Sequence, residues 1–292
     1  MLFAKNDKSF YKKKSTINLS GRLIDLSSPV AMGIINVTPD SFYDGGAYST
    51  DLKILKRAEQ ILREGATFID IGAMSTRPGA KEISLNEELD RLLPAVRILR
   101  QEFPEAFLSV DTYRSEVVKY VYDETGDFVV NDISGGTFDD RMFEKVASLK
   151  LPYILMHTRG KSEVMQQNPV YKDLLKDVIL FLSAKVQELR LMGVADIIID
   201  PGFGFGKTAS HNYELLNRLD AFKIFELPVL VGLSRKAMIW RELDITPNEC
   251  LNGTTVLNTI ALLGGCDVLR VHDVKEAVES IILVGKIKSS VK

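Results

Sequence analysis

Residues 174–200, LLKDVILFLSAKVQELRLMGVADIIID, contain one helix and one strand in succession. Apolar side chains recur every three or four positions from Leu174 to Leu189, which is the spacing of the buried face of a helix. Gly193 supplies a residue that readily ends a helix, and the run that ends at Ile199 has the composition of a buried strand. A helix that leads into a buried strand is the repeating unit of parallel α/β folds.

The same unit recurs along the chain. Short apolar runs rich in β-branched residues predict eight strands, at residues 30–37, 67–71, 107–110, 128–130, 153–156, 196–199, 229–231 and 267–271. Most intervals between them have helical periodicity, and Ser84 with Glu87 has the spacing of a helix-capping box. Eight such units in about 260 residues favour an α/β fold of the (β/α)₈ or TIM barrel class. The alternative is an open Rossmann-like sheet, but no strand is followed by its GxGxxG motif.

The length and composition agree with a single barrel domain. The chain has 292 residues, of which 46% are hydrophobic and 26% are charged, as in ordinary globular proteins with a packed core. Residues 17–26 alternate apolar and polar side chains around Ser20 and Gly21, which predicts a β-hairpin. We therefore expect a short N-terminal hairpin extension over residues 1–28 and one TIM barrel over residues 29–292. We expect neither a secretion signal nor a membrane span.

Charge and cysteine content narrow the partners and the compartment. The 37 basic and 39 acidic residues leave a formal charge of −2, so we expect neither nucleic acid nor a membrane surface as a partner. Any anionic ligand would be held by a few placed side chains. The two cysteines, Cys250 and Cys266, are too few for a disulfide framework, which favours a cytoplasmic location.

In a TIM barrel, the residues that follow the strands meet at one mouth, where the chemistry is carried. Asp111, Asn131 and Asp200 follow or end three of the predicted strands. Carboxylates and amides can bind the amino and ring N–H edge of a guanidine-like heterocycle, which suggests a pterin or a purine. Taken singly, Asp111 and Asn131 could equally be helix caps, whereas Asp200 would be costly to bury without a partner.

A second group of polar residues suits an anion. Arg77, Arg270 and His272 would form an anion pocket at the same mouth, and Asn36 adds a neutral oxygen donor. Such a set could hold a diphosphate and its Mg²⁺. Each arginine alone could be a solvated surface charge, so this prediction depends on their convergence at one mouth.

Two other motifs are incomplete. The run that ends in Gly206, Lys207 and Thr208 lacks the first glycine of a P-loop, because Pro201 occupies that position. The three histidines lack zinc-ligand spacing, so we do not expect a zinc site.

Five segments resemble the signatures of the dihydropteroate synthase family, whose members are pterin-binding (β/α)₈ barrels. They are NVTPDSFYDGG at 36–46, STRPGA at 75–80, NDISGG at 131–136, DPGFGFGK at 200–207 and RVH at 270–272. The resemblance covers nearly the whole chain. It implies a transferase of folate biosynthesis that joins 6-hydroxymethyl-7,8-dihydropterin diphosphate to 4-aminobenzoate, yields 7,8-dihydropteroate and diphosphate, and uses Mg²⁺.

The resemblance also implies a role for each site residue. The residues expected at the pterin are Asp111, Asn131, Ile133, Met156, Asp200 and Lys236. Those expected at the diphosphate are Asn36, Thr76, Arg77, Arg270 and His272, with Asn36 as the Mg²⁺ ligand. The 4-aminobenzoate site, where sulfonamides compete in this family, would consist of Phe42, Pro78, Phe205, Ser234 and Lys236. The residues expected to act in catalysis are Asp44, Thr76, Arg77, Lys236, Arg270 and His272, and the family leads us to expect a homodimer.

The implied reaction is a dissociative displacement of diphosphate. An arylamine is neutral at pH 7, so no strong base is needed, and the barrier lies in the departure of diphosphate. The cationic groups and Mg²⁺ would stabilise that leaving charge. Asp111 and Asp200 would favour a pterin ring that bears positive charge.

Two rival functions use the same type of barrel. A methyltetrahydrofolate-binding methyltransferase would share the carboxylates and the amide but would not need Arg77 or the pair of Arg270 and His272. A non-catalytic pterin-binding homologue would be expected to lose the loop residues, which are present here. The chain departs from the family pattern at residues 72–74, Gly-Ala-Met in place of Gly-Gly-Glu, and just after His157. These departures affect loops rather than the groups assigned to chemistry.

Overall fold

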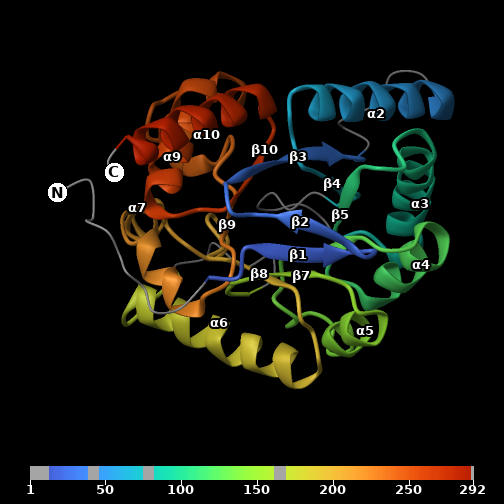
Figure 1. The fold of residues 1–292 in the computed structure, drawn as a ribbon, viewed down its shortest axis with the longest axis horizontal. Coiled ribbons are helices and arrows are strands. Elements are labelled where there is room, and N and C mark those ends of the chain that lie inside the picture. The colour runs from blue at the N-terminus through green and yellow to red at the C-terminus, as the bar shows by residue number, and fades with distance from the viewer. Residues whose placement is uncertain (1–12, 39–45, 75–81, 161–168, 291–292) are drawn as a thin grey trace.

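The computed structural model describes residues 13–38, 46–74, 82–160 and 169–290. Eight parallel strands form the predicted barrel (Figure 1). In chain order they are β3 (Val30–Asn36), β4 (Phe68–Gly72), β5 (Phe107–Asp111), β6 (Val129–Asp132), β7 (Tyr153–Met156), β8 (Ile197–Asp200), β9 (Leu230–Val231) and β10 (Val268–Val271). Each of them overlaps the strand that the sequence predicts at that place.

The eight strands close into a ring. Strands β3 to β8 pair in chain order, and β10 lies between β3 and β9. A parallel bridge between Ile199 and Val229 joins β8 to β9, and Ile199 N donates to Pro228 O at 2.9 Å. The two ends of the sheet therefore meet, as the closure of a barrel requires.

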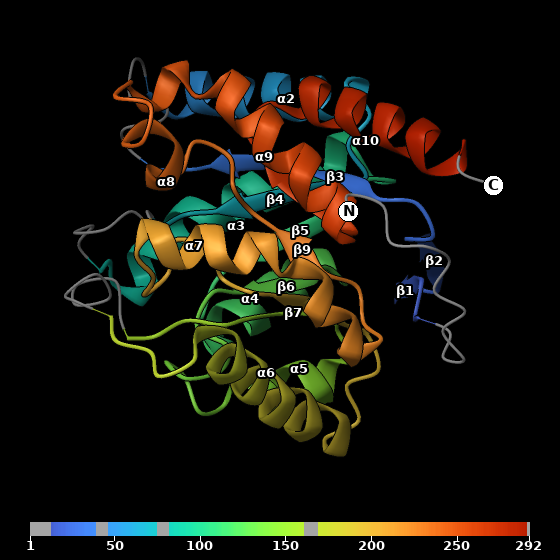
Figure 2. The same ribbon diagram turned by 90° about the vertical axis from the view of Figure 1, so that its left-hand side faces the viewer.

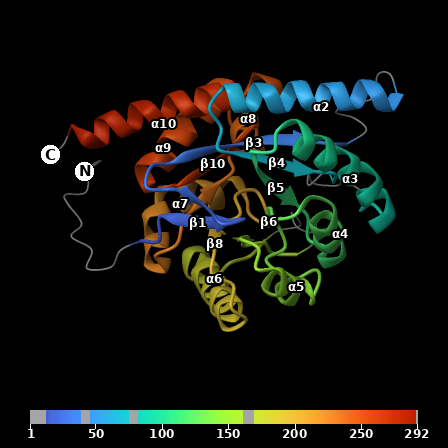
Figure 3. The ribbon, with the colours of Figure 1, turned by 45° about the vertical axis from the view of Figure 1, so that its right-hand side comes forward.

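Helices cover the outside of the barrel (Figures 1 and 2). They are α2 (Gly46–Arg63), α3 (Leu85–Glu102), α4 (Ser115–Thr125), α5 (Met142–Leu149), α6 (Leu174–Leu191), α7 (Ala209–Asn217), α8 (Ala237–Trp240), α9 (Leu251–Gly264) and α10 (Val274–Ser289), with 3₁₀ turns η1 (Leu219–Phe225) and η2 (Pro247–Glu249). Figure 3 shows α2 to α6 following one another around the barrel. The predicted face of α6 is buried, and Gly193 follows the helix with a φ of 90°. None of the described helices has the length and hydropathy needed to cross a membrane.

Side chains alternate between the barrel interior and the layer beneath the helices. On β4, Ile69 and Ile71 belong to the core beneath the helices, whereas Phe68 packs with Met32 in a separate cluster inside the barrel. Asp70 is two residues from Phe68, so the same alternation turns its carboxylate inward. The interior therefore changes from apolar to charged within a single strand.

The predicted hairpin covers the amino-terminal end of the barrel. Strand β1 (Thr16–Leu19) pairs antiparallel with β2 (Arg22–Asp25), and Ser20 and Gly21 have the positive φ values of a type I′ turn. Figure 2 shows this hairpin at one end of the strands. One buried apolar cluster joins the hairpin to the barrel and contains Ile17, Leu19, Ile24, Leu26, Met32, Phe68, Val129, Ile154, Ile198, Leu230 and Val268.

Helix caps account for several polar side chains. Ser84 Oγ accepts a hydrogen bond from Glu87 N at 3.2 Å, as its spacing predicts. In the described structure the Glu87 carboxylate pairs with Arg91, so the reciprocal half of that capping box is replaced by an ion pair along the helix. Thr208 and His211 form a complete capping box at the start of α7. One of the three histidines is thus part of a helix cap.

Candidate active site

The carboxyl-terminal ends of the strands bring predicted site residues together. Asp111 ends β5 and Asp200 ends β8, while Asn131 and Arg270 lie on β6 and β10. Asn36 ends β3, which pairs directly with β10. Because all these strands are parallel, the side chains share one mouth. The two carboxylates and Asn131 are buried, whereas Asn36 and Arg270 are partly exposed there.

A carboxylate that no sequence motif marks lies within this group. Asp70 on β4 is fully buried. Its Oδ1 accepts a hydrogen bond from Ser109 Oγ at 2.6 Å, and Asn131 Nδ2 lies 3.2 Å from each of its two oxygens. Arg270 Nε donates to Asp70 Oδ2 at 2.6 Å. Asp70 thus contacts one amide and one guanidinium of the predicted site.

The local signal for Asp70 is its place inside an apolar strand. It stands between two isoleucines in the run FIDIG, where an unpaired charge would be costly. That signal indicates that partners exist but does not name them. Ser109, Asn131 and Arg270 come from three other strands and become neighbours only when the barrel closes.

Arg270 also contacts Asp111. Its Nη2 donates to Asp111 Oδ2 at 2.8 Å. Burial opposes the charge of Arg270, but Asp70 and Asp111 outweigh burial and raise its pKa, so Arg270 stays cationic. Burial raises the pKa of Asp111 to about 7, an effect that Arg270 opposes and Asp70 reinforces. Asp111 therefore exchanges its proton near neutral pH while Arg270 keeps its charge.

Asp200 caps the loop that follows β8 and lies among cations. Its Oδ1 accepts a hydrogen bond from Gly202 N at 2.7 Å, so Asp200 does serve as a local cap. Burial raises the pKa of Asp200, and Lys236 is the strongest charge that opposes the rise. The capping bond uses only one of the two carboxylate oxygens. A capping role and a ligand-binding role are therefore compatible in this residue.

Lys236 connects the carboxylates with the residues predicted at 4-aminobenzoate. Its Nζ lies 4.7 Å from the centre of the Phe205 ring and donates a hydrogen bond to Phe203 O. Burial lowers the pKa of Lys236 to about 8, against the attraction of Asp200. Lys236 is consequently a cation at neutral pH, with its charge beside an aromatic ring.

Ser234 and His272 form a hydrogen-bonded pair. His272 N donates to Ser234 Oγ at 3.2 Å, and the same Oγ lies 2.9 Å from His272 Nδ1. Burial, reinforced by Arg270 and Arg235, lowers the pKa of His272 to about 4. In the predicted anion pocket, His272 therefore offers a neutral imidazole, and Arg270 supplies the charge.

The remaining predicted residues fall into two groups. Met156 ends β7 and Ile133 follows β6, and both side chains are buried. The other group, Phe42, Asp44, Thr76, Arg77 and Pro78, lies outside the described residues. Within the part of the chain that the structure describes, no three histidine, cysteine or carboxylate side chains group closely enough to hold a metal ion by themselves.

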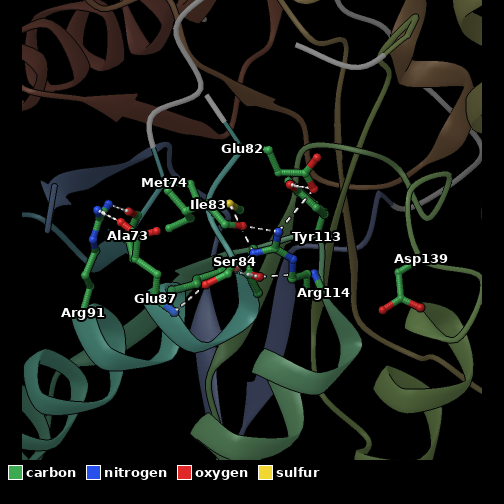
Figure 4. A network of polar contacts seen from close by, with 12 residues as sticks. Ala73, Met74, Glu82, Ile83, Ser84, Glu87, Arg91, Tyr113, Arg114 and Asp139 are labelled. Carbon is green, nitrogen blue, oxygen red and sulfur yellow. Dashed lines mark hydrogen bonds and ion pairs between the residues drawn. The ribbon is translucent and has the colours of Figure 1, made fainter. Parts of the chain in front are cut away.

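A polar network holds the chain on both sides of residues 75–81 (Figure 4). Arg114 donates to Ile83 O at 2.6 Å and pairs with the buried Glu88. The same guanidinium lies 3.8 Å from Met74 Sδ, at a position where the chain departs from the family pattern. Residues 74 and 83 are thus both tied to one arginine.

Comparison with known proteins shows which family the chain is related to. A family model described as pterin binding enzyme matches residues 32–272. The dihydropteroate synthase of Escherichia coli (strain K12) is 43% identical over 266 residues, which cover 90% of this chain and 93% of that protein. The dihydropteroate synthase of Synechocystis sp. is 44% identical over 247 residues, or 84% of this chain and 85% of that protein.

Solved structures give the same result. A Yersinia pestis dihydropteroate synthase with a sulfonamide drug complex is 42% identical, with a TM-score of 0.88 over 94% of this chain and 99% of that one. A Xanthomonas albilineans dihydropteroate synthase with 4-aminobenzoic acid is 34% identical, with a TM-score of 0.86 over 94% of this chain and 98% of that one. The chain belongs to the dihydropteroate synthase family of pterin-binding enzymes.

Proposed function

We propose that the mouth of this barrel joins 6-hydroxymethyl-7,8-dihydropterin diphosphate to 4-aminobenzoate and releases 7,8-dihydropteroate and diphosphate. The observation that carries the proposal is Arg270, a permanent cation held between Asp70 and Asp111 beside Asn131. This places an anion-binding group next to the carboxylate and amide that suit a pterin edge. The family relatives support the same reaction.

The pterin half of the substrate would bind to the buried carboxylates and the amide. Asp111 and Asp200 can accept hydrogen bonds from the amino and ring N–H groups, and Asn131 can both donate and accept. Met156 and Ile133 supply apolar surface for the ring. Asn131, Asp200 and Asp111 are each held by another hydrogen bond before the substrate binds. Little side-chain conformational entropy should therefore be lost on binding.

The diphosphate half would bind on the β10 side of the mouth. Arg270 supplies the positive charge, and His272 supplies a neutral imidazole that can donate one hydrogen bond. Thr76 and Arg77 are proposed for the same half, and Asp44 is proposed for catalysis, from the sequence alone.

A Mg²⁺ ion fits the donors at this end of the site. Mg²⁺ prefers oxygen ligands and commonly binds through a few protein oxygens together with substrate phosphates and water. The Asn36 amide oxygen, at the end of β3 and beside the strand of Arg270, would be such a ligand. When bound, the ion would neutralise charge on the diphosphate.

The 4-aminobenzoate half would occupy the side of the mouth formed by Phe205, Ser234 and Lys236, with Phe42 and Pro78 proposed from the sequence. The Phe205 ring can pack against the benzoate ring, and the nearby Lys236 charge suits its carboxylate. We expect sulfonamides to compete there, as in the drug complex of the Yersinia pestis relative.

The chemistry follows from these contacts. The bond between the pterin methylene carbon and the diphosphate oxygen breaks first, and Arg270 stabilises the charge that develops on the departing oxygens. The carboxylates of Asp111 and Asp200 favour the positive charge left on the pterin. The neutral arylamine nitrogen then bonds to the methylene carbon and loses a proton, so no side chain has to act as a strong base.

A direct assay tests the proposal. Purified protein is mixed with the pterin diphosphate, 4-aminobenzoate and Mg²⁺, and both dihydropteroate and diphosphate are measured. Stoichiometric formation of the two products, inhibited by a sulfonamide in competition with 4-aminobenzoate, is the expected result. A folded sample that binds the pterin but forms no product would contradict the proposal and favour a non-catalytic pterin-binding protein.

We also propose that the protein is a cytoplasmic homodimer. Helices α9 and α10 pack against each other and expose large apolar side chains, among them Val256, Leu283 and Ile287. Exposed apolar side chains on two adjoining helices are typical of a surface that binds a second copy of the chain. The free thiols of Cys250 and Cys266 suit a reducing compartment. Light scattering should give twice the monomer mass, and Leu283→Glu should shift it toward the monomer, whereas Leu180→Glu on the exposed surface of α6 should not.

A further inference from the structure

Lys207 is a buried cation that the proposed reaction does not use. It ends the DPGFGFGK segment, and only 4% of its surface is exposed. Its Nζ lies 2.9 Å from His157 Nδ1, 2.8 Å from Gly202 O and 3.1 Å from Phe205 O. An ammonium group has three hydrogens and no acceptor, so these three partners use it completely.

The loop between β8 and α7 is shaped around this ammonium group. Gly202 has a φ of 73°, and a Cβ atom there would lie 1.8 Å from His157 O. Gly206 has a φ of 62°, and a Cβ atom there would lie 2.8 Å from Arg159 O. The loop is therefore pressed against the chain that follows β7. Its buried carbonyl groups need a donor, and Lys207 supplies it.

The charge of Lys207 also belongs to the electrostatics of the mouth. Burial lowers the pKa of Lys207 to about 7, Asp200 opposes that shift, and Lys236 reinforces it. Burial, with the charges of Lys207 and Arg159, lowers the pKa of His157 to about 2, so His157 stays neutral and can accept a hydrogen bond. Lys236 contacts the same loop, since it donates to Phe203 O.

We propose that Lys207 is a positioning residue that holds the β8–α7 loop against His157 and thereby places Phe205 for the binding of 4-aminobenzoate. The inference rests on the proposed function, because it assumes that Phe205 lies at the aminobenzoate site. Lys207 itself touches no substrate in this account. Its effect passes through the carbonyl groups of Gly202 and Phe205.

Steady-state kinetics of Lys207→Met test the proposal. The variant keeps the length of the side chain but loses all three donated bonds, so the KM for 4-aminobenzoate should rise by about tenfold or more. The KM for the pterin diphosphate should change by less than about threefold, because Arg270 and Asn131 keep their contacts with Asp70. Equal increases in both KM values, or an unchanged KM for 4-aminobenzoate, would overturn the proposal.

Lys288→Met is the matched control. Lys288 is an exposed lysine on α10 that donates to Leu262 O at 2.7 Å, away from the mouth. Lys288→Met makes the same change of side chain as Lys207→Met and also removes a hydrogen bond to a main-chain carbonyl. Both KM values should stay unchanged in this variant. Restoration of the low KM by Lys207→Arg, which keeps a charged donor, would further support a role for the donated bonds.

Nitrogen NMR of the histidines gives a readout that does not depend on activity. The chain has only three histidines, so the His157 ring can be assigned with single substitutions. At about pH 6, below the pKa of Lys207, His157 Nδ1 should be an unprotonated acceptor with the ring proton on Nε2. The Nδ1 resonance should move toward that of an unbonded nitrogen in Lys207→Met, and an unchanged resonance would contradict the contact.

The two hypotheses fail in different ways. If the wild-type protein forms no dihydropteroate, the proposed function is wrong, and the NMR result still decides whether Lys207 holds His157. If Lys207→Met does not fold, His157→Leu and His157→Asn replace it. His157→Leu removes one acceptor and should raise the KM for 4-aminobenzoate. His157→Asn keeps an acceptor near the Nδ1 position, so its KM for 4-aminobenzoate should be close to the wild-type value. Equal kinetics in these two variants would overturn the proposal.

Discussion

The two ends of the barrel are built from the same strands and have opposite character. On four strands an inward apolar residue is followed two positions later by an inward polar one: Phe68 and Asp70, Val129 and Asn131, Ile198 and Asp200, Val268 and Arg270. Two positions is one step of the pleat on the same face of a strand. The apolar amino-terminal end of the barrel interior, called the floor below, and the polar mouth therefore lie in adjacent layers of side chains.

The two ends of the barrel contribute differently to the free energy of unfolding. At the floor, apolar burial contributes about 25 cal/mol for each Å² removed from water. At the mouth, each buried charge is unfavourable unless it is paired, and the pairs there do little more than offset that cost. The floor thus stabilises the fold. The charged pairs at the mouth add little net stability, and their polar groups are available to bind a ligand. Substitutions at the two ends should separate stability from activity.

The largest effect is expected for Arg270→Met. This change leaves the buried carboxylates of Asp70 and Asp111 without their shared cation, and breaking such a pair lowers the free energy of unfolding by roughly 3–5 kcal/mol. The loss of the diphosphate contact should lower kcat/KM by about a hundredfold. Urea unfolding and steady-state kinetics measure the two effects. A kcat/KM within threefold of wild type would remove Arg270 from the site.

Arg22→Met is the control at the opposite end. Arg22 belongs to the hairpin and pairs with Glu105, which is largely exposed. An exposed ion pair contributes about 0–1 kcal/mol, so stability should change little and kcat/KM not at all.

A pure loss of stability is expected for Leu19→Ala in the hairpin. Leu19 is 2% exposed within the apolar cluster of the floor, and removing its side chain should lower the free energy of unfolding by about 2–5 kcal/mol. At a temperature where the variant is folded, kcat and both KM values should match wild type. Leu23→Ala, in the same hairpin but 71% exposed, should change stability by less than about 0.5 kcal/mol. Altered kinetics in folded Leu19→Ala would contradict the separation of the two ends.

An intermediate result is expected for Asp70→Asn, which lies at the boundary. The amide carries no charge and cannot accept from both Ser109 and Arg270, which donate to different oxygens of the carboxylate, so the free energy of unfolding should fall by about 1–3 kcal/mol. Activity should fall with it, with the KM for the pterin diphosphate as the most affected constant. Asp267→Asn is the control, because Asp267 is a buried carboxylate at the amino-terminal end that accepts from Val229 N at 2.7 Å. It should affect stability alone.

The smallest effect is expected in the pH dependence. Binding of the pterin edge needs ionised Asp111, whose pKa is about 7, and protonated Lys236, whose pKa is about 8. The kcat/KM for the pterin diphosphate should therefore rise as the pH increases through about 7 and fall beyond about 8. Lys207, whose pKa is also about 7, should instead affect the KM for 4-aminobenzoate. His157 and His272, with pKa values of about 2 and 4, do not titrate in this range. In Asp111→Asn the rise of kcat/KM through about pH 7, which is the acid limb of the profile, should disappear. If the rise persists, a group other than Asp111 causes it.

Stability should follow the opposite trend over the acid limb. Because folding raises the pKa of Asp111, this carboxyl group contributes most to stability below the pH at which it titrates in the unfolded chain, and the contribution is lost as the pH rises through about 7. Wild type should therefore lose stability relative to Asp111→Asn between about pH 4 and pH 7. Urea unfolding of both proteins across this range measures the difference.

Local periodicity was enough to predict the elements. Apolar spacing located α6, and short β-branched runs located all eight barrel strands, because burial of one face imposes a period that a short window of sequence contains. The hairpin followed from the alternation around Ser20 and Gly21. The same reasoning placed Asp111, Asn131, Asp200 and Arg270 at one mouth, since parallel strands bring their carboxyl ends together.

The partners of those residues required the closed barrel. Asp70 looks like an isolated charge in an apolar strand until β5, β6 and β10 bring its donors to it. Lys207 looks like the lysine of an incomplete P-loop until the glycine loop folds back and turns its carbonyl groups onto the ammonium group. The physical reason is range: periodicity acts over a few neighbouring residues, whereas hydrogen-bond partners and pKa values depend on groups that are distant in sequence and meet only through strand register and closure.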